Sequence, residues 1–147
     1  MRKTVAVDLD GVLAEYHGWK GLDHIGDPIP GAQEFCRQLA EFANVTIYTT
    51  RCSVELGRFE DIEQLVGRVR DWLLNQGFEP GVHWHDIWSG QGKPIYAALV
   101  DDRAVVCDPQ RFGGPDVAYR SAMRRVLDLC ECIPNDEGGL AGAQVAQ

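Results

Sequence analysis

The sequence predicts an α/β fold in which a parallel sheet carries helices on both faces. Short apolar runs rich in β-branched residues alternate along the chain with segments of helical period, as in proteins with a parallel sheet. Polar clusters follow three of these runs, at residues 8–10, 49–51 and 101–102. Because ligands of such folds bind at the carboxyl ends of the strands, we expect the three clusters to converge at one edge of the sheet.

Strands and helices are expected in the alternating order that this fold class requires. The apolar runs predict strands over residues 3–8, 45–48, 84–88, 97–100 and 105–107. Apolar side chains spaced three and four apart predict helices over residues 31–42, 62–76 and 117–129. The helix over residues 62–76 has the clearest pattern, and Gly77 is expected to end it.

Two segments lack a helical or strand period. Residues 15–30 are rich in Gly, Pro, His and aromatic side chains, which predicts an irregular flap. Residues 134–147 contain few large hydrophobic side chains, so we expect a mobile C-terminal tail. The remaining length, residues 1–133, fits a single domain with a buried core.

Composition narrows the class of protein. No apolar run approaches the roughly 20 residues of a membrane helix, so we expect a soluble protein without a membrane partner. The net charge of −8 argues against an extended nucleic-acid-binding surface. The five cysteines are odd in number and form no Cys-x-x-Cys motif, so neither disulfides nor a zinc knuckle is indicated and a reducing cytoplasm fits best.

The first polar cluster contains two aspartates, Asp8 and Asp10, at the end of an apolar run. Residues two apart on a strand point to the same side, so we expect both carboxylates to face one spot. Two such charges repel unless a cation lies between them or one of them keeps its proton. The alternative is a turn with solvated acids, since Gly11 permits a sharp turn.

Four motifs occur in a fixed order along the chain: Asp-x-Asp-Gly at residues 8–11, Thr at 49, Gly-Lys-Pro at 92–94 and Asp-Asp at 101–102. This order resembles the haloacid dehalogenase-like (HAD) superfamily of phosphohydrolases. The resemblance implies a three-layer, Rossmann-like parallel sheet and a phosphatase that hydrolyses a phosphomonoester through an aspartyl-phosphate. Asp8 would be the nucleophile, and Asp10 the general acid and base.

The resemblance also implies a Mg²⁺ cofactor. The ion would be held by the Asp8 carboxylate, the Asp10 main-chain carbonyl and an acid from the last motif, either Asp101 or Asp102. Both acids remain candidates for this role.

The other implied roles concern the transferred phosphoryl group. Thr49 would bind one of its oxygens, with Thr50 as the competitor for this role. Lys93 would neutralise the charge that develops on the group.

The motif spacing leaves no room for a large cap domain. Thr49 follows Asp10 by 39 residues (49 minus 10), and Lys93 follows Thr49 by 44 (93 minus 49), and both spans already contain a helix and a strand. Members of the family without a cap tend to have open sites. Such sites admit large substrates such as nucleic-acid ends or phosphoproteins, or are covered by a partner subunit in a homo-oligomer. Thr-Thr-Arg at residues 49–51 and Asp-Asp-Arg at residues 101–103 resemble short segments of nucleotide and polynucleotide-end phosphatases in the family, which suggests a nucleotide or a polynucleotide end as substrate.

Further substrate contacts are expected from the flap and from the second polar cluster. His17, Trp19 and His24 lie in the flap and could touch the leaving group, although a packed or solvated role is the alternative. Arg51 could clamp a second phosphate or a carboxylate. The competing function is a HAD-fold regulatory module that binds a phosphoryl group or a nucleotide without turnover.

Overall fold

The computed structural model describes residues 2–53, 55, 61–90, 95–110, 113–130, 133–134 and 140–141. The chain divides into two compact units, residues 1–102 and 103–147, and each is described by itself. A single domain over residues 1–133 stays a prediction.

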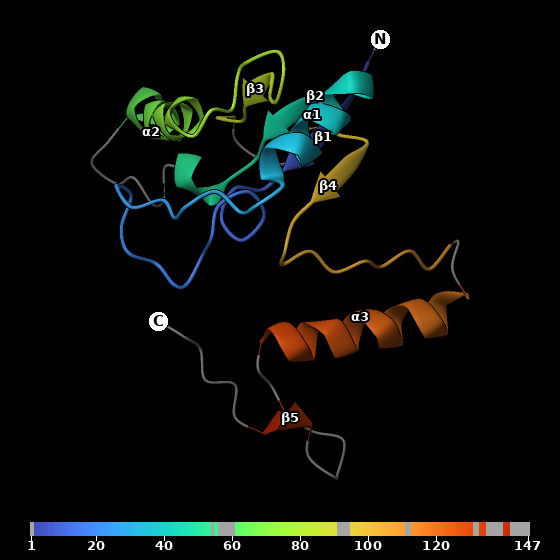
Figure 1. Cartoon of the computed structure of the whole chain (residues 1–147). Helices are drawn as coiled ribbons and strands as arrows, with labels where there is room; N and C mark the ends of the chain where they lie inside the picture. Colours follow the sequence, from blue (N-terminus) through green and yellow to red (C-terminus); the bar gives the residue numbers. More distant parts are fainter. Residues whose placement is uncertain are drawn as a thin grey trace. The chain divides into compact units, whose positions relative to one another are not determined.

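The first unit contains a four-stranded parallel sheet and two helices (Figure 1). The strands are β1 (Lys3–Val7), β2 (Ala43–Ile47), β3 (Asp86–Ile87) and β4 (Ala98–Val100), in the spatial order β3-β2-β1-β4. The helices are α1 (Ala32–Phe42) and α2 (Ile62–Asn75), with a short 3₁₀ turn, η1 (Thr50–Cys52), after β2. The predicted α/β class with a parallel sheet is confirmed.

One face of this sheet packs against both helices. Val5 pairs with Val45, and Val7 pairs with Ile47, so the alternate residues of the two strands line the same face. These side chains share one buried cluster with Cys36 of α1 and with Val66, Val69 and Leu73 of α2. The cluster therefore fixes the carboxyl ends of β1 and β2 side by side.

Local signals explain where the second helix begins and ends. Asp61 caps α2 by accepting a hydrogen bond from the Gln64 N–H, and the Gln64 side chain bonds back to Asp61. Gly77, with φ of +81°, follows the last turn, as expected of a helix-ending glycine. Both predicted helices of this unit are confirmed within one residue at each end.

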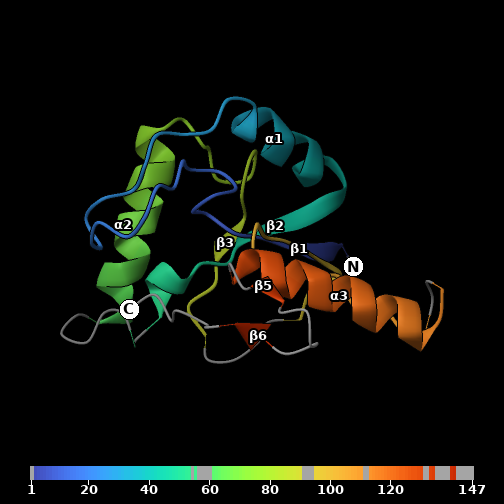
Figure 2. The same cartoon turned by 90° about the horizontal axis from the view of Figure 1, so that it is seen from below.

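The second unit contains α3 (Pro115–Leu129) and a short antiparallel pair, β5 (Ile133–Pro134) with β6 (Leu140–Ala141) (Figure 2). The predicted helix is confirmed and begins two residues earlier than expected. A helix layer on the second face of the sheet stays a prediction. Most of the tail predicted to be mobile, residues 134–147, lies outside the described residues.

The strand predicted over residues 105–107 is wrong. These residues have no regular secondary structure, and Val106 is 81% exposed. A run of only three apolar residues before Asp108-Pro109 is too short to indicate a strand by itself.

None of the helices in the described part of the chain has both the length and the apolar character needed to cross a bilayer. The cysteines within the same part are free thiols: Cys36, Cys52, Cys107 and Cys130.

Candidate functional site

Three carboxylates meet where β1 and β4 end. Asp8 directly follows β1, and Asp101 and Asp102 directly follow its parallel neighbour β4. One oxygen from each of the three lies within 4.8 Å of the other two. The Asp8 N–H donates to the Val100 carbonyl at 2.9 Å, which joins the two strand ends. The expected convergence of the first and last polar clusters is confirmed.

The surroundings of Asp8 disfavour its negative charge. Burial, and then the negative charges of Asp101, Asp102 and Asp10, raise the pKa of Asp8 to about 7. The Leu9 N–H opposes this shift by donating to Asp8 Oδ1 at 2.8 Å. The cluster therefore favours either a proton on Asp8 or a cation near it. A hard divalent cation such as Mg²⁺ suits three carboxylates, and Asp101 and Asp102 are both near enough to serve as ligands.

Gly11 makes room for this cluster. It has a φ of +82°, which L side chains rarely adopt, and a Cβ atom at this position would overlap the carboxylate of Asp102. The glycine expected to permit a sharp turn is therefore also needed for the close approach of the last motif.

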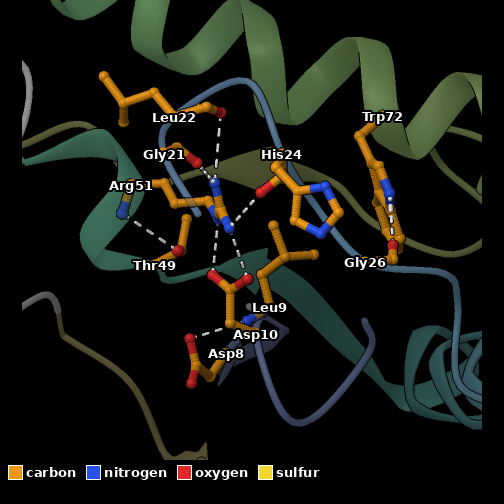
Figure 3. A network of polar contacts seen from close by, with 10 residues as sticks. All are labelled: Asp8, Leu9, Asp10, Gly21, Leu22, His24, Gly26, Thr49, Arg51 and Trp72. Atoms are coloured by element: carbon orange, nitrogen blue, oxygen red, sulfur yellow. Dashed lines mark hydrogen bonds and ion pairs between the residues drawn. The ribbon is translucent and has the colours of Figure 1, made fainter. Parts of the chain in front are cut away.

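Asp10 does not face the same spot as Asp8, and that expectation is wrong. β1 ends at Val7, so Asp8 and Asp10 are not both on a strand. The carboxylate of Asp10 instead receives two hydrogen bonds from Arg51, Nε to Oδ2 at 2.7 Å and Nη2 to Oδ1 at 2.9 Å. Figure 3 shows the Asp10 carboxylate turned toward Arg51 and the Asp8 carboxylate turned away from it.

The guanidinium of Arg51 is held entirely by protein groups. Its remaining hydrogen bonds go to main-chain carbonyls of the flap: Gly21 at 3.4 Å, Leu22 at 3.3 Å and His24 at 2.8 Å. These three bonds and the two to Asp10 match the five N–H donors of a guanidinium. Arg51 is 3% exposed. Its donors, predicted to clamp a substrate anion, are used within the protein in this structure.

Thr49 and Thr50 differ in their surroundings. Thr49 is buried and caps η1, because its Oγ1 accepts a hydrogen bond from the Arg51 main-chain N–H at 3.2 Å. A hydroxyl that accepts one hydrogen bond still carries a proton to donate. Thr50 is exposed on the first turn of η1. Thr49 is therefore the buried member of the pair, with a hydroxyl proton still available to donate.

The flap lies over Asp10 and Arg51, as an irregular segment with no helix or strand of its own, which confirms the prediction for residues 15–30. A cavity of about 210 Å³ between them is lined by Asp10, Arg51 and flap residues that include His17 and His24. The ring of Trp19 lies over the Arg51 guanidinium, 4.9 Å from Cζ to the ring centroid. All three flap residues predicted to contact substrate are therefore close to this pair.

Sequence reasoning missed other parts of this region. Tyr16 and Lys20 also line the cavity, but their residue types carry no signal that separates them from surface residues. The Asp10–Arg51 pair joins residues 41 apart, so only the fold brings it together. Lys93, predicted to neutralise charge, lies outside the described residues.

His83 and His85 form a His-x-His pattern of the kind found in metal sites, but both have main-chain partners. His83 Nδ1 accepts from the Glu79 N–H and His85 Nδ1 from the Val45 N–H, each at 2.9 Å. Within the described residues, the group of side chains close enough to share a metal ion is the acid cluster of Asp8, Asp101 and Asp102.

Comparisons of the chain with family models, with curated proteins and with solved structures found no match. A functional assignment therefore depends on the residues themselves and on their geometry.

Proposed function

We propose that the protein is a Mg²⁺-dependent phosphomonoesterase with a HAD-like, Rossmann-type core, and that Asp8 forms an aspartyl-phosphate. The observation that carries this proposal is the acid cluster between the ends of β1 and β4. In the order β3-β2-β1-β4, the chain steps to one side of β1 for β2 and β3, and to the other side for β4. Ligands of open α/β sheets bind at such a reversal of strand order.

The side chains present fit the proposed cation. Asp8, Asp101, Asp102 and the main-chain carbonyl of Asp10 offer oxygen ligands of the kind that Mg²⁺ prefers. When bound, the ion would supply positive charge against the nucleophile and the incoming phosphate. Burial, and then repulsion from the neighbouring carboxylates, raises the pKa of Asp8, and a counter-ion would offset both effects.

The proposed chemistry has two steps. An oxygen of Asp8 attacks phosphorus, the bond to the leaving oxygen breaks, and Asp10 donates a proton to that oxygen. In the second step Asp10 takes a proton from water, the water oxygen attacks phosphorus, and inorganic phosphate leaves Asp8. Thr49 would donate a hydrogen bond to the phosphoryl group, and Lys93 would neutralise its charge.

The leaving group would occupy the cavity beside Asp10, because the proton donor must touch the leaving oxygen. The motif spacing leaves the flap as the main cover of this side. A nucleotide or a polynucleotide end, with most of the substrate outside the cavity, is the substrate class that we propose for an enzyme of this kind.

One observation favours the alternative, a regulatory module that binds a phosphoryl group without turnover. Both oxygens of Asp10 accept hydrogen bonds from a guanidinium, and an ionised carboxylate is the form that accepts from both. Asp10 cannot donate a proton in this arrangement. The enzyme proposal therefore requires a rearrangement at Asp10 during the reaction.

Two substitutions at the paired acids test the proposal. Asp8→Asn removes the nucleophile, so no phosphorylated intermediate should form from an aryl phosphate with Mg²⁺. Asp10→Asn should slow turnover by about 10² to 10⁴ yet still allow phosphorylation by an activated aryl phosphate, whose leaving group needs little acid catalysis. Intact-mass spectrometry detects the intermediate. A wild-type protein that binds a fluoride mimic of phosphate with Mg²⁺ but hydrolyses no phosphoester would support the regulatory module instead.

A further inference from the structure

We propose that Arg51 is a positioning residue that fixes the flap over Asp10, rather than a residue that binds substrate. The structural part of this proposal concerns contacts within the chain, and only the kinetic part rests on the proposed function. The flap here means residues 15–30.

The guanidinium of Arg51 forms hydrogen bonds with two different parts of the chain. Two parallel hydrogen bonds join Arg51 to Asp10, and the three remaining N–H groups point to carbonyls of the flap. A planar guanidinium can make both sets at once because its five donors lie in one fixed plane. Arg51 therefore joins a carboxylate at the sheet edge to main-chain atoms of an irregular segment. For a substrate phosphate to bind these donors, it would have to displace Asp10 or the flap.

The ion pair between Arg51 and Asp10 is buried. Both partners of the ion pair are shielded, with side chains 4% and 16% exposed for Arg51 and Asp10. Removing one partner of a buried pair leaves the other charge without compensation. Loss of the guanidinium would also leave the Gly21, Leu22 and His24 carbonyls without the donor that turns them inward. The ring of Trp19 also lies over the same guanidinium.

Other contacts hold the rest of the flap independently of Arg51. The Trp72 Nε1–H donates to the Gly26 carbonyl at 3.0 Å, which attaches the flap to α2. The Glu15 N–H donates to the Asp27 carbonyl, and the Ile29 N–H donates to the Leu13 carbonyl, both at 2.8 Å. Arg51 holds the middle of the flap, residues 19–24, where a more exposed ion pair also runs from Arg68 Nε of α2 to Asp23 Oδ1 at 2.7 Å. The two ends of the flap have their own hydrogen bonds.

Hydrogen exchange of the magnesium-free protein can compare the middle of the flap with its two ends. In Arg51→Lys and Arg51→Gln, amides of residues 19–24, including the His24 N–H, should exchange about tenfold faster or more. The amides of Glu15 and Ile29 should keep their wild-type rates. Arg51→Lys retains the charge but not the planar fork, so rescue by lysine should be incomplete.

A matched arginine provides the control. Arg37 on α1 also forms hydrogen bonds with two carboxylates, Glu34 and Glu41, but it is exposed and both of its partners lie on α1 rather than in the flap. Arg37→Gln should leave flap exchange and turnover unchanged. Asp10→Asn should also speed amide exchange of residues 19–24. The Asp10→Asn/Arg51→Gln double variant should exchange no faster than whichever single variant exchanges faster, because both substitutions remove the same ion pair.

Kinetics separate positioning from substrate binding. If Arg51 positions the flap, Arg51→Gln should lower kcat for an activated aryl phosphate, whose leaving group needs little proton donation from Asp10, by about tenfold or more, because the flap beside the leaving group is no longer ordered. The Kd of inorganic phosphate with Mg²⁺ should stay within about threefold. Unchanged flap exchange together with a loss of phosphate affinity of about tenfold would overturn the proposal and assign Arg51 to phosphate binding.

Two further outcomes are decisive. If Arg51→Gln does not fold, Arg51→Lys and Asp10→Asn are measured in its place, and wild-type exchange of residues 19–24 in both would overturn the proposal. If the wild-type protein shows neither phosphatase activity nor phosphate binding, the proposed function fails, while faster flap exchange in the variants would still support the role of Arg51.

Discussion

A Cβ atom at Gly11 would overlap the carboxylate of Asp102, so the turn after β1 and the end of β4 are packed without room for a side chain. The two residues belong to the first and last motifs of the chain. The shape of the acid cluster therefore depends on a hydrogen atom at position 11.

Gly11→Ala should weaken Mg²⁺ binding beyond its effect on folding. Alanine at a positive φ costs about 1–2 kcal/mol, and at Gly11 it would also displace Asp102. Gly81→Ala is the matched control, because Gly81 has nearly the same φ, +81°, with nothing within 4 Å of a Cβ atom. Without metal, urea unfolding should show a loss in Gly11→Ala at least as large as that in Gly81→Ala, and the gain from Mg²⁺ should be reduced in Gly11→Ala alone. Equal gains from Mg²⁺ would contradict this account of Gly11.

The stability of the metal-free protein should fall as pH rises from about 4 to 7. The pKa of Asp8 is raised to about 7 by burial and by neighbouring acids, so the folded state keeps a proton that the unfolded chain releases near pH 4. The folded state then binds more protons in this window, and the free energy of unfolding decreases through it and levels off above it. Because Asp8 is only half-buried, we expect a loss of about 1–2 kcal/mol.

Denaturant unfolding in chelator at several pH values measures this loss. In Asp8→Asn, the free energy of unfolding should change little between pH 4 and 7. Asp71→Asn removes an exposed carboxylate on α2 and should keep the wild-type decrease of this free energy with pH. Mg²⁺ should restore stability at pH 8. A wild-type profile without a slope would show that Asp8 ionises as in the unfolded chain.

Hydrolysis of an aryl phosphate should require Mg²⁺ and stop in excess chelator. Ca²⁺ should substitute poorly, because its longer bonds and higher coordination number would misplace the Asp8 carboxylate. The double variant His83→Ala/His85→Ala should keep the same metal requirement, since both rings have main-chain partners outside the acid cluster. Full activity in chelator, or a zinc requirement lost in the histidine variant, would rule out the proposed metal site.

Thr49→Val should impair both the site and the turn that follows β2. The variant loses the hydroxyl that caps η1, at a cost of about 1 kcal/mol, and the hydrogen bond proposed to the phosphoryl group. Turnover should fall by about tenfold or more, as for loss of a charge-stabilising donor. Thr49→Ser should recover most of it. The exposed Thr50 is the control, and a larger effect from Thr50→Val than from Thr49→Val would exchange the two roles.

The parts of the site that follow from strand ends could be predicted from the sequence. β1 and β4 are apolar runs followed at once by acids, and parallel pairing brings such ends together whatever the intervening chain does. Helices α1, α2 and α3 could be predicted because their apolar side chains repeat with helical period.

The direction of a side chain beyond a strand end could not be predicted in the same way. Treating residues 8–10 as part of the strand placed Asp8 and Asp10 on one side, but the chain leaves the sheet after Val7. The partner of Asp10, Arg51, could not be chosen from sequence either, because any nearby cation would have satisfied the same charge. Burial of Arg51 between the sheet edge and the flap decides that pairing.

β4 is three residues long and pairs with β1 alone among the described strands. A short strand at the edge of a sheet opens at a lower free energy than the strands in its interior. Such opening would carry Asp101 and Asp102 away from Asp8 without unfolding the rest of the unit. A cation held by all three carboxylates binds only the closed edge and so stabilises it by mass action. The affinity of the acid cluster for a cation and the persistence of β4 in the sheet are therefore set by one equilibrium.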